Sequence, residues 1–192
     1  MNEIASFFDS LADRWDELCT HDADKINTIL EQTTLHKGLR ILDIGCGTGV
    51  LEKYLLPYSP ASIVAIDISG QMIEMAKSKY ATSIVDFRQA NVLDMKEELF
   101  DYIIAYSVFP HFEHQQETIS HLADLLVPDG ELVICHSEGR NKINSHHNKH
   151  AGKLSFGLPA AKELADWMQP YFTIHSIYDS DDYYLVSGLR KL

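Results

Sequence analysis

The sequence predicts an α/β fold of the doubly wound type, with a mostly parallel seven-stranded sheet that closes in an antiparallel C-terminal hairpin. From residue 39 onward, short β-branched runs alternate with longer stretches of helical periodicity, a pattern typical of βαβ units. A glycine-rich turn directly follows the first of these runs. Only the short acidic turn 179–182 separates the last two runs, which is too little chain for a crossover helix, so we expect them to pair antiparallel.

Each expected element has its own local signal. The strands are short runs rich in apolar and β-branched residues, and they cover residues 39–44, 62–66, 84–89, 102–106, 131–136, 172–178 and 183–189. The runs 62–66 and 102–106 are nearly continuously apolar, as expected of parallel strands buried on both faces. The helices follow apolar residues at helical spacing, and they cover 50–56, a segment after the N-cap residue Ser69, 114–126 and 159–169. Pro57 is expected to end the first helix, residues 128–130 to form a turn, and the polar stretch 137–157 to form a loop.

The charge balance excludes several kinds of partner. The 192 residues include 28 Asp and Glu against 16 Lys and Arg, which gives a net charge of −12 with the 10 His counted as neutral. Nucleic acid and anionic membrane surfaces bind to clustered Lys and Arg, so neither is expected as a partner. The hydrophobic content of 45% is enough for one sizeable core, and a single globular unit is expected. The sequence does not indicate an oligomeric state.

The sequence predicts a cytoplasmic protein in which cysteine chemistry plays no part. No stretch approaches the roughly 18 to 20 apolar residues that cross a bilayer, and Met1-Asn2-Glu3 does not resemble the start of a signal peptide. Cys19, Cys46 and Cys135 are odd in number and form no C-x-x-C pair. This argues against a disulfide framework and against a thiolate zinc site.

The chemistry-bearing residues gather around the turn Gly45-Cys46-Gly47-Thr48-Gly49. Glycine lets the backbone approach a ligand closely, and Asp67, 18 residues after Gly49 at the end of the next strand, can accept hydrogen bonds from two ribose hydroxyls. Asp43 would repel a pyrophosphate but would suit an ammonium group. The patterns of dinucleotide and triphosphate sites are both lacking. The combination predicts a ribose-containing, cationic, phosphate-free ligand, S-adenosylmethionine.

The segment 41–49 resembles the first motif of the class I S-adenosylmethionine-dependent methyltransferases of the small-molecule type, which have a Rossmann-like fold. Segments 64–69, 100–104 and 125–134 also match family motifs, so the resemblance covers about residues 39–136. It implies S-adenosyl-L-methionine as cofactor and S-adenosyl-L-homocysteine as product.

The resemblance also implies residue roles. Asp43 would lie near the cofactor's ammonium group, Asp67 would hold the ribose, and Ile68 and Met72 would pack against adenine. Asn91 stands where the family often has Asp, and its side-chain carbonyl can accept the same hydrogen bond from adenine. The implied cofactor-binding residues are Asp43, Gly45, Cys46, Gly47, Gly49, Asp67, Ile68, Met72, Asn91, Val92 and Tyr106.

Two histidines follow predicted parallel strands at the edge where ligands bind in such sheets. His111 comes after the fourth strand and His136 ends the fifth. Histidine titrates near neutral pH, so either is a candidate base that takes a proton from a hydroxyl, thiol or ammonium acceptor. For His111, a hydrogen bond to the backbone within its Pro-His-Phe turn is the alternative.

His146, His147 and His150 form a further candidate catalytic group. If this segment is helical, His146 and His150 share a face at the i, i+4 spacing that suits one metal ion. The Glu of a His-Glu-x-x-His zinc-protease motif is missing. A solvated polar loop is the alternative.

The chain is expected to divide into a helical N-terminal lid or extension, 1–38, and an S-adenosylmethionine-binding domain, 39–192. Phe7, Phe8 and Trp15 resemble the lead-in helix of small-molecule methyltransferases, which folds over the cofactor. Ordinary core packing of an amphipathic helix is the alternative. His21, beside Asp22, is a candidate to reach the site from this lid, and the start of a helix at Thr20 is the alternative explanation of this segment.

The sequence therefore predicts an enzyme that transfers the methyl group of S-adenosylmethionine to a small-molecule acceptor, with the acceptor atom (O, N or S) undetermined. Tyr106-Ser107-Val108-Phe109 replaces the family's usual pattern for amino-nitrogen methylation of bases or glutamine. Two alternatives stay open: a metal-dependent or metal-chelate methylase that uses the His136–His150 cluster, and a noncatalytic S-adenosylmethionine-binding sensor.

Overall fold

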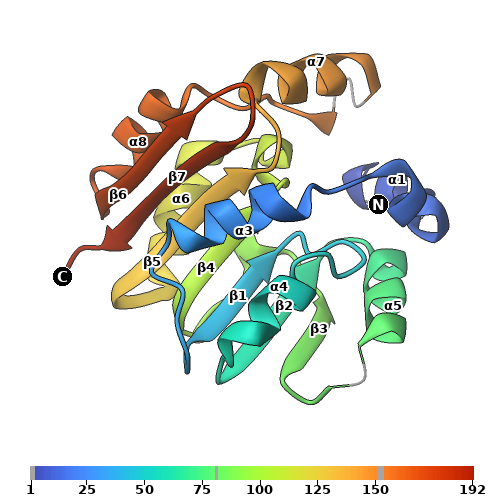
Figure 1. Cartoon of the computed structure of the whole chain (residues 1–192), viewed down its shortest axis with the longest axis horizontal. Coiled ribbons are helices and arrows are strands. Elements are labelled where there is room, and N and C mark those ends of the chain that lie inside the picture. The colour runs from blue at the N-terminus through green and yellow to red at the C-terminus, as the bar shows by residue number, and fades with distance from the viewer. Residues whose placement is uncertain (1–2, 81, 151–153) are drawn as a thin grey trace.

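Seven strands form one sheet, and Figure 1 shows how they lie side by side. The computed structural model of the chain describes residues 3–80, 82–150 and 154–192, with the backbone alone over 146–150. The strand order is β3-β2-β1-β4-β5-β7-β6, and β7 runs antiparallel to both of its neighbours. The strands are β1 (Arg40–Ile44), β2 (Ser62–Asp67), β3 (Val85–Gln89), β4 (Phe100–Tyr106), β5 (Leu126–His136), β6 (Phe172–Asp179) and β7 (Tyr184–Arg190). The predicted doubly wound fold and its antiparallel hairpin are confirmed.

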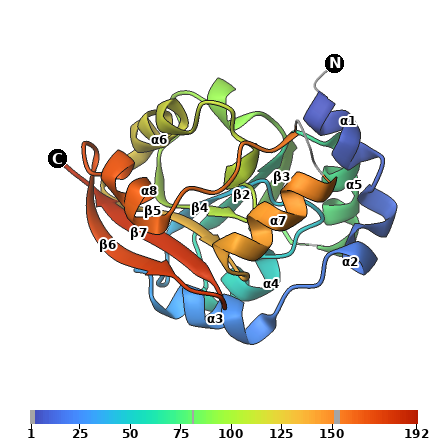
Figure 2. The ribbon, with the colours of Figure 1, turned by 90° about the horizontal axis from the view of Figure 1, so that it is seen from above.

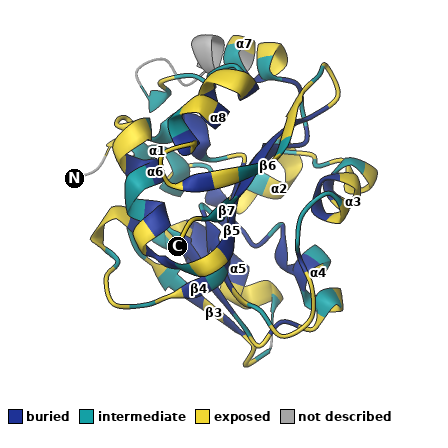
Figure 3. Cartoon of the chain, turned by 90° about the vertical axis from the view of Figure 1, so that its left-hand side faces the viewer, coloured by how far each residue is buried: buried dark blue, intermediate teal, exposed yellow. Residues whose placement is uncertain are grey.

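Helices cover both faces of the sheet (Figure 2). The helices are α1 (Glu3–Asp9), α2 (Trp15–Leu18), α3 (Ala23–Glu31), α4 (Glu52–Leu55), α5 (Gly70–Lys79), α6 (Gln115–Asp124), α7 (Arg140–His150) and α8 (Ala161–Met168). Successive side chains of a strand point to opposite faces, so Ile41 and Ile63 pack with α3, α4 and α5, whereas Leu42 and Val64 pack with α6 and α8. Most strands are accordingly buried, and β6 at the sheet edge is the most exposed (Figure 3).

The N-terminal segment is helical, as expected, but it is divided into short pieces. A 3-10 turn, Ala12–Arg14, separates α1 from α2, and α3 begins after the N-cap residue Asp22, whose carboxylate accepts hydrogen bonds from the backbone N–H groups of Asp24 and Lys25. α3 buries Ile26 and Ile29 against the sheet. Its apolar stripe therefore anchors the whole segment.

Two carboxylates fasten the N-terminal helices to the loops that follow β1 and β2. Asp9 Oδ1 accepts hydrogen bonds from Ser69 Oγ at 2.6 Å and from the Gln71 backbone N–H at 3.1 Å. Asp16 Oδ1 accepts a hydrogen bond from Thr48 Oγ1 at 2.5 Å. The segment is thus tied directly to the glycine-rich turn and to the start of α5.

Part of the stretch expected to be a polar loop is the helix α7. This segment has little helical periodicity of apolar residues, and its structure depends on contacts with the rest of the chain. Ile143 is buried in the core, and the Asn144 side chain bonds both the backbone N–H and the carbonyl of Leu158, at 2.8 and 3.0 Å. Long-range packing of this kind cannot be read from a local pattern.

Two other local expectations need correction. The residues 128–130, expected to form a turn, lie within β5, where the pairing with β4 shifts register between Phe100 and Tyr102 and Asp129 adopts a positive φ of 61°. Pro128 is exposed within this bulge, where its missing backbone N–H costs no hydrogen bond between the strands. The first predicted helix is shorter, since α4 spans one turn and a 3-10 turn, Leu56–Tyr58, carries Pro57.

No helix within the described ranges is both long enough and apolar enough to span a membrane.

Candidate functional site

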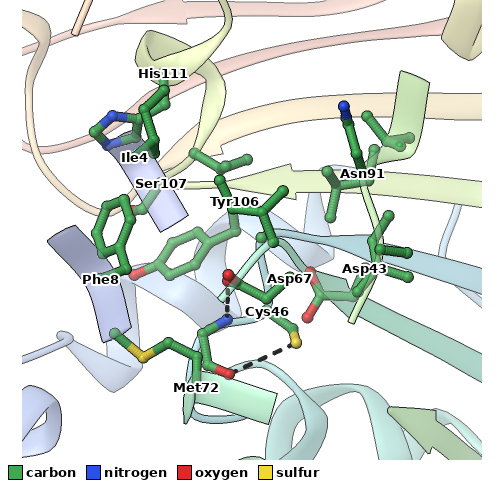
Figure 4. A pocket seen from close by; sticks show the side chains of 18 of the residues that line it. Ile4, Phe8, Asp43, Cys46, Asp67, Met72, Asn91, Tyr106, Ser107 and His111 are labelled. Atoms are coloured by element: carbon green, nitrogen blue, oxygen red, sulfur yellow. Dashed lines mark hydrogen bonds between the residues drawn. The ribbon is translucent and has the colours of Figure 1, made fainter. Parts of the chain in front are cut away.

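A cavity of about 230 Å³ lies at the carboxyl ends of β1, β2 and β4. Two neighbouring strands, β1 and β4, have their crossover helices on opposite faces of the sheet, and ligands of open α/β sheets bind at such a switch point. Figure 4 shows Ile4, Phe8 and His111 on one side of the cavity and Asn91 on the other. The site thus lies between the N-terminal helices and the loops that follow the strands.

The glycine-rich turn forms the floor of the cavity. Gly45 and Gly47 have positive φ values of 68° and 54°, which glycine adopts without the strain of a side chain. A Cβ at Gly45 would lie 2.4 Å from the nearest Val108 side-chain atom, so the backbone of the turn and the loop after β4 meet closely. The backbone N–H groups of Gly45 and Cys46 both donate to the Ile66 carbonyl, which ties the turn to β2.

Gly49 lies away from the cavity lining. Its carbonyl accepts a hydrogen bond from the Tyr80 hydroxyl at 2.7 Å, and a Cβ there would lie 2.8 Å from the Tyr80 ring. The remaining ten predicted cofactor-binding residues all line the cavity. Their individual roles stay predictions.

Asp67, at the end of β2, connects the glycine turn to the start of α5. Its Oδ2 accepts a hydrogen bond from the Gly47 backbone N–H at 3.0 Å, and its Oδ1 accepts one from the Ser69 backbone N–H at 2.8 Å. Burial raises the pKa of Asp67, and these backbone hydrogen bonds oppose that shift. Each oxygen keeps a lone pair for a ligand hydroxyl.

Asp43, at the end of β1, is buried at 1% exposure beside a second buried carboxyl, Glu52 of α4. Burial, and then the neighbouring Glu52 charge, raise the pKa of Asp43 well above its ordinary value. Burial also raises the pKa of Glu52, to about 7. Asp43 Oδ2 receives no hydrogen bond from the residues that the structure describes, so it can accept one from a ligand cation. Glu52 was not among the predicted site residues, although a charged residue directly after Val50-Leu51 was the available signal.

Apolar side chains and one amide form the wall on the β3 side. Met72 and Val92 are buried there, and Ile68 lies beside them in the lining. Asn91 Oδ1 accepts a hydrogen bond from the Leu93 backbone N–H at 3.1 Å and so caps the 3-10 turn Val92–Asp94. This wall is suited to a flat, weakly polar ring.

A chain of hydrogen bonds lies at the other side. His21 Nδ1 is 2.8 Å from the Tyr106 hydroxyl, which is 2.7 Å from Ser137 Oγ. These residues come from the segment before α3, the end of β4 and the loop after β5, and His21 and Tyr106 line the cavity. Burial lowers the pKa of His21 and raises that of Tyr106, so both are neutral near pH 7.

Aromatic side chains cover the cavity on the side of the N-terminal helices. The Phe8 ring packs edge-on against Trp15 at 5.4 Å and against His111 at 5.3 Å, measured between ring centroids. Ile4 and Phe112 complete this layer. Ser107, at the end of β4, has a positive φ of 56° and also lines the cavity; no local signal in the sequence pointed to it.

The candidate catalytic histidines have different surroundings. His111 lines the cavity, and its Nδ1 lies 2.8 Å from the Leu154 carbonyl. His136 is buried at the end of β5, edge-on to Tyr184, and is not part of the lining. The side chains of His146, His147 and His150 lie outside the described residues, so the metal hypothesis based on them stays a prediction. Where side chains are described, no group of three or more His, Cys, Asp or Glu is arranged to hold a metal ion.

A family model described as "Methyltransferase domain" matches residues 42–134. Among curated proteins, the chain is 27% identical over 180 residues to a malonyl-[acyl-carrier protein] O-methyltransferase of Priestia megaterium, covering 86% of this chain and 64% of that protein. It is also 27% identical over 164 residues to the cyclopropane-fatty-acyl-phospholipid synthase of Escherichia coli, covering 83% of this chain and 42% of that protein. The chain therefore spans less than two thirds of the length of these relatives.

Among solved structures, the fold is similar to that of the N-methyltransferase NodS from Bradyrhizobium japonicum in complex with S-adenosyl-L-homocysteine. The TM-score is 0.77 at 18% sequence identity, and the match covers 98% of this chain and 99% of that one. At this level of identity the likeness concerns the fold.

Proposed function

We propose that the chain, which matches a methyltransferase family model over residues 42–134, is a class I S-adenosylmethionine-dependent methyltransferase and transfers a methyl group from this cofactor to a small-molecule acceptor. The observation that supports the proposal most is the cavity itself. It brings Asp43, Asp67 and the glycine turn together at the switch point of the sheet, beneath an aromatic cover.

The residues present fit this cofactor. Asp67 offers carboxylate oxygens to two hydroxyls, and the turn from Gly45 to Gly47 leaves the backbone open to close approach. Asp43 Oδ2, buried and without a donor among the described residues, suits the ammonium group. The wall formed by Ile68 and its apolar neighbours suits adenine. We therefore assign the cofactor to these residues.

The chain's own part in the reaction is to position and to shield. When bound, the cofactor supplies an electrophilic methyl carbon on a sulfonium, and a nucleophile must be held in line with the carbon–sulfur bond. Phe8, Trp15 and His111 would exclude water and confine the acceptor against the loop after β4. No charged group is needed to stabilise the leaving thioether, because it is neutral.

Incubation with methyl-labelled S-adenosylmethionine and a panel of phenol, thiol, amine and carboxylate acceptors tests the proposal. We expect label to move to at least one acceptor, and S-adenosylhomocysteine to bind in calorimetry. Binding without transfer to any acceptor would contradict a methyltransferase and favour a cofactor sensor.

We assign residues 1–38 the role of a lid, fastened by Asp9 on the start of α5. Replacing Asp9 with Ala removes the acceptor for Ser69 Oγ and for the Gln71 N–H, so we expect S-adenosylhomocysteine to dissociate several-fold faster, as for the loss of one hydrogen-bonded cap. Stopped-flow release measures this rate. Asp13→Ala, an exposed carboxylate in the same segment, is the matched control. Equal release rates in both variants would mean that Asp9 does not hold the lid.

A further inference from the structure

We propose that the acceptor is an uncharged hydroxyl or thiol on a largely apolar molecule, and that His21 Nε2 takes its proton during transfer. The inference rests on the proposed methyltransferase function and adds to it the acceptor class and the base. It is carried by the hydrogen-bond chain from His21 to Ser137 and by the charges of the cavity lining.

The hydrogen-bond chain leaves one nitrogen of His21 available for a proton. Nδ1 lies 2.8 Å from the Tyr106 hydroxyl, and that hydroxyl lies 2.7 Å from Ser137 Oγ. If Nδ1–H donates to Tyr106 and Tyr106 donates to Ser137, every hydroxyl in the chain has a partner. Nε2 is then the unprotonated nitrogen, and it is buried with no hydrogen-bond partner among the described residues.

Tyr106 and Ser137 act on the acceptor through His21 and are positioning residues. Tyr106, at the end of the central strand β4, and Ser137, directly after β5, are both 6% exposed, so burial holds the two hydroxyls in place. The His21 ring also lies 5.4 Å from the Tyr106 ring. A base that is held by its second nitrogen keeps one tautomer and one orientation.

The charge of the lining indicates which acceptors fit. Among the described residues that form it, Asp43, Asp67 and Glu113 are acidic, and none is Lys or Arg. An anionic acceptor such as a carboxylate or phosphate would find no cation there and would meet these acidic groups. Ile4, Phe8 and Val108 offer apolar contact, so a desolvated ammonium is disfavoured as well. An uncharged hydroxyl or thiol that still carries its proton avoids both the repulsion by the acidic groups and the cost of desolvating an ammonium.

The proposed step is balanced without a further reactant. A bond forms between the acceptor oxygen or sulfur and the methyl carbon while the carbon–sulfur bond breaks, and both of its electrons stay on the thioether sulfur. The acceptor proton moves to Nε2, which leaves an imidazolium hydrogen-bonded to Tyr106. Opening of the lid returns that proton to water.

Burial and the Lys53 charge outweigh two facing carboxylates and keep His21 neutral near pH 7. Burial and then the Lys53 charge of α4 lower the pKa of His21, whereas Asp16 of α2 and Glu138, which follows β5, raise it by less, so this pKa lies below 6.5. The fourth facing group, Tyr106, stays protonated. We therefore expect the rate of methyl transfer to fall below pH 6.5, because a His21 imidazole that is already protonated cannot take the proton of the acceptor.

Nitrogen NMR of histidine-labelled protein with S-adenosylhomocysteine tests the base without using activity. We expect His21 to carry its proton on Nδ1 and to titrate below pH 6.5. In Tyr106→Phe, which removes the partner hydroxyl, we expect this single tautomer to give way to a mixture. A proton on Nε2 in the parent protein would overturn the proposal.

Transfer assays complete the test with four matched probes: phenol, thiophenol, benzoate and benzylamine. We expect methylation of phenol or thiophenol, and His21→Gln should reduce it at least about 100-fold with the dissociation constant of S-adenosylhomocysteine unchanged within about threefold. His36→Gln, an exposed histidine before β1, is the control and should leave transfer unchanged.

The remaining outcomes separate the two hypotheses. Preference for benzoate or benzylamine, full transfer in His21→Gln, or loss only in His111→Gln would overturn the acceptor class or the base and leave the methyltransferase function intact. Binding of S-adenosylhomocysteine without transfer to any probe would overturn both.

Discussion

Replacement of Asp67 with Ala should weaken binding of S-adenosylmethionine by on the order of 100-fold or more. The carboxylate is assigned two ribose hydroxyls, and hydrogen bonds to a charged group contribute about 1.5 to 3 kcal/mol each. It also accepts the Gly47 and Ser69 backbone N–H groups, at 3.0 and 2.8 Å, so its removal loosens the turn that approaches the cofactor. Calorimetry with S-adenosylhomocysteine measures the change directly.

Two further variants separate these contributions. Asp67→Asn keeps one acceptor oxygen and the shape of the side chain, so we expect a smaller loss than for Ala. Asp124→Ala removes an exposed carboxylate at the end of α6 and should leave binding unchanged. A dissociation constant for Asp67→Ala within threefold of the parent value would show that the ribose assignment is wrong.

The local signals that predicted the strands are also those that stabilise them. Runs such as 62–66 and 102–106 are apolar on both faces, and both faces are buried, so prediction and outcome rest on the same burial. Ser69 was expected to cap a helix, and its hydroxyl accepts the Met72 N–H at 3.1 Å. Where local and tertiary preferences agree in this way, a strand or a helix start can be predicted from sequence.

The errors lie where distant segments decide the outcome. α7 depends on the contact between Asn144 and Leu158, and the β5 bulge depends on pairing with β4. The motif residues Gly45 and Asp67 could be predicted because Gly45 directly follows β1 and Asp67 ends β2, each beside the loop after its strand, so a local pattern marks each one. The link from His21 to Tyr106 joins residues 85 apart in the chain, so no spacing rule reveals it. Conversely, His136 ends a strand as predicted but lies outside the cavity lining, next to Tyr184.

The buried carboxyl pair of Asp43 and Glu52 should make the protein less stable as the pH rises. Burial raises the pKa of Glu52 from 4.5 to about 7, so the folded state holds this proton more tightly than the unfolded state does. Below about pH 4.5 the group is neutral in both states and costs nothing. Above about pH 7 it is ionised in both states, and the folded state bears the full cost of the buried charge, on the order of 3 kcal/mol.

Glu52→Gln keeps the shape of the side chain and removes this charge. We expect it to equal the parent protein in stability near pH 4.5 and to exceed it by on the order of 3 kcal/mol at pH 8, with the difference growing between those limits. Urea unfolding across this pH range measures it, and Glu31→Gln, exposed at the end of α3, is the control and should follow the parent curve. Parallel curves for Glu52→Gln and the parent would show that Glu52 ionises as an ordinary surface carboxyl.

Because the Glu52 charge also raises the pKa of Asp43, Asp43 should ionise at lower pH in the Glu52→Gln variant. If Asp43 meets the cofactor's ammonium group, as proposed, the variant should then release fewer protons on binding S-adenosylhomocysteine near pH 7, which calorimetry in buffers of different ionisation enthalpy detects.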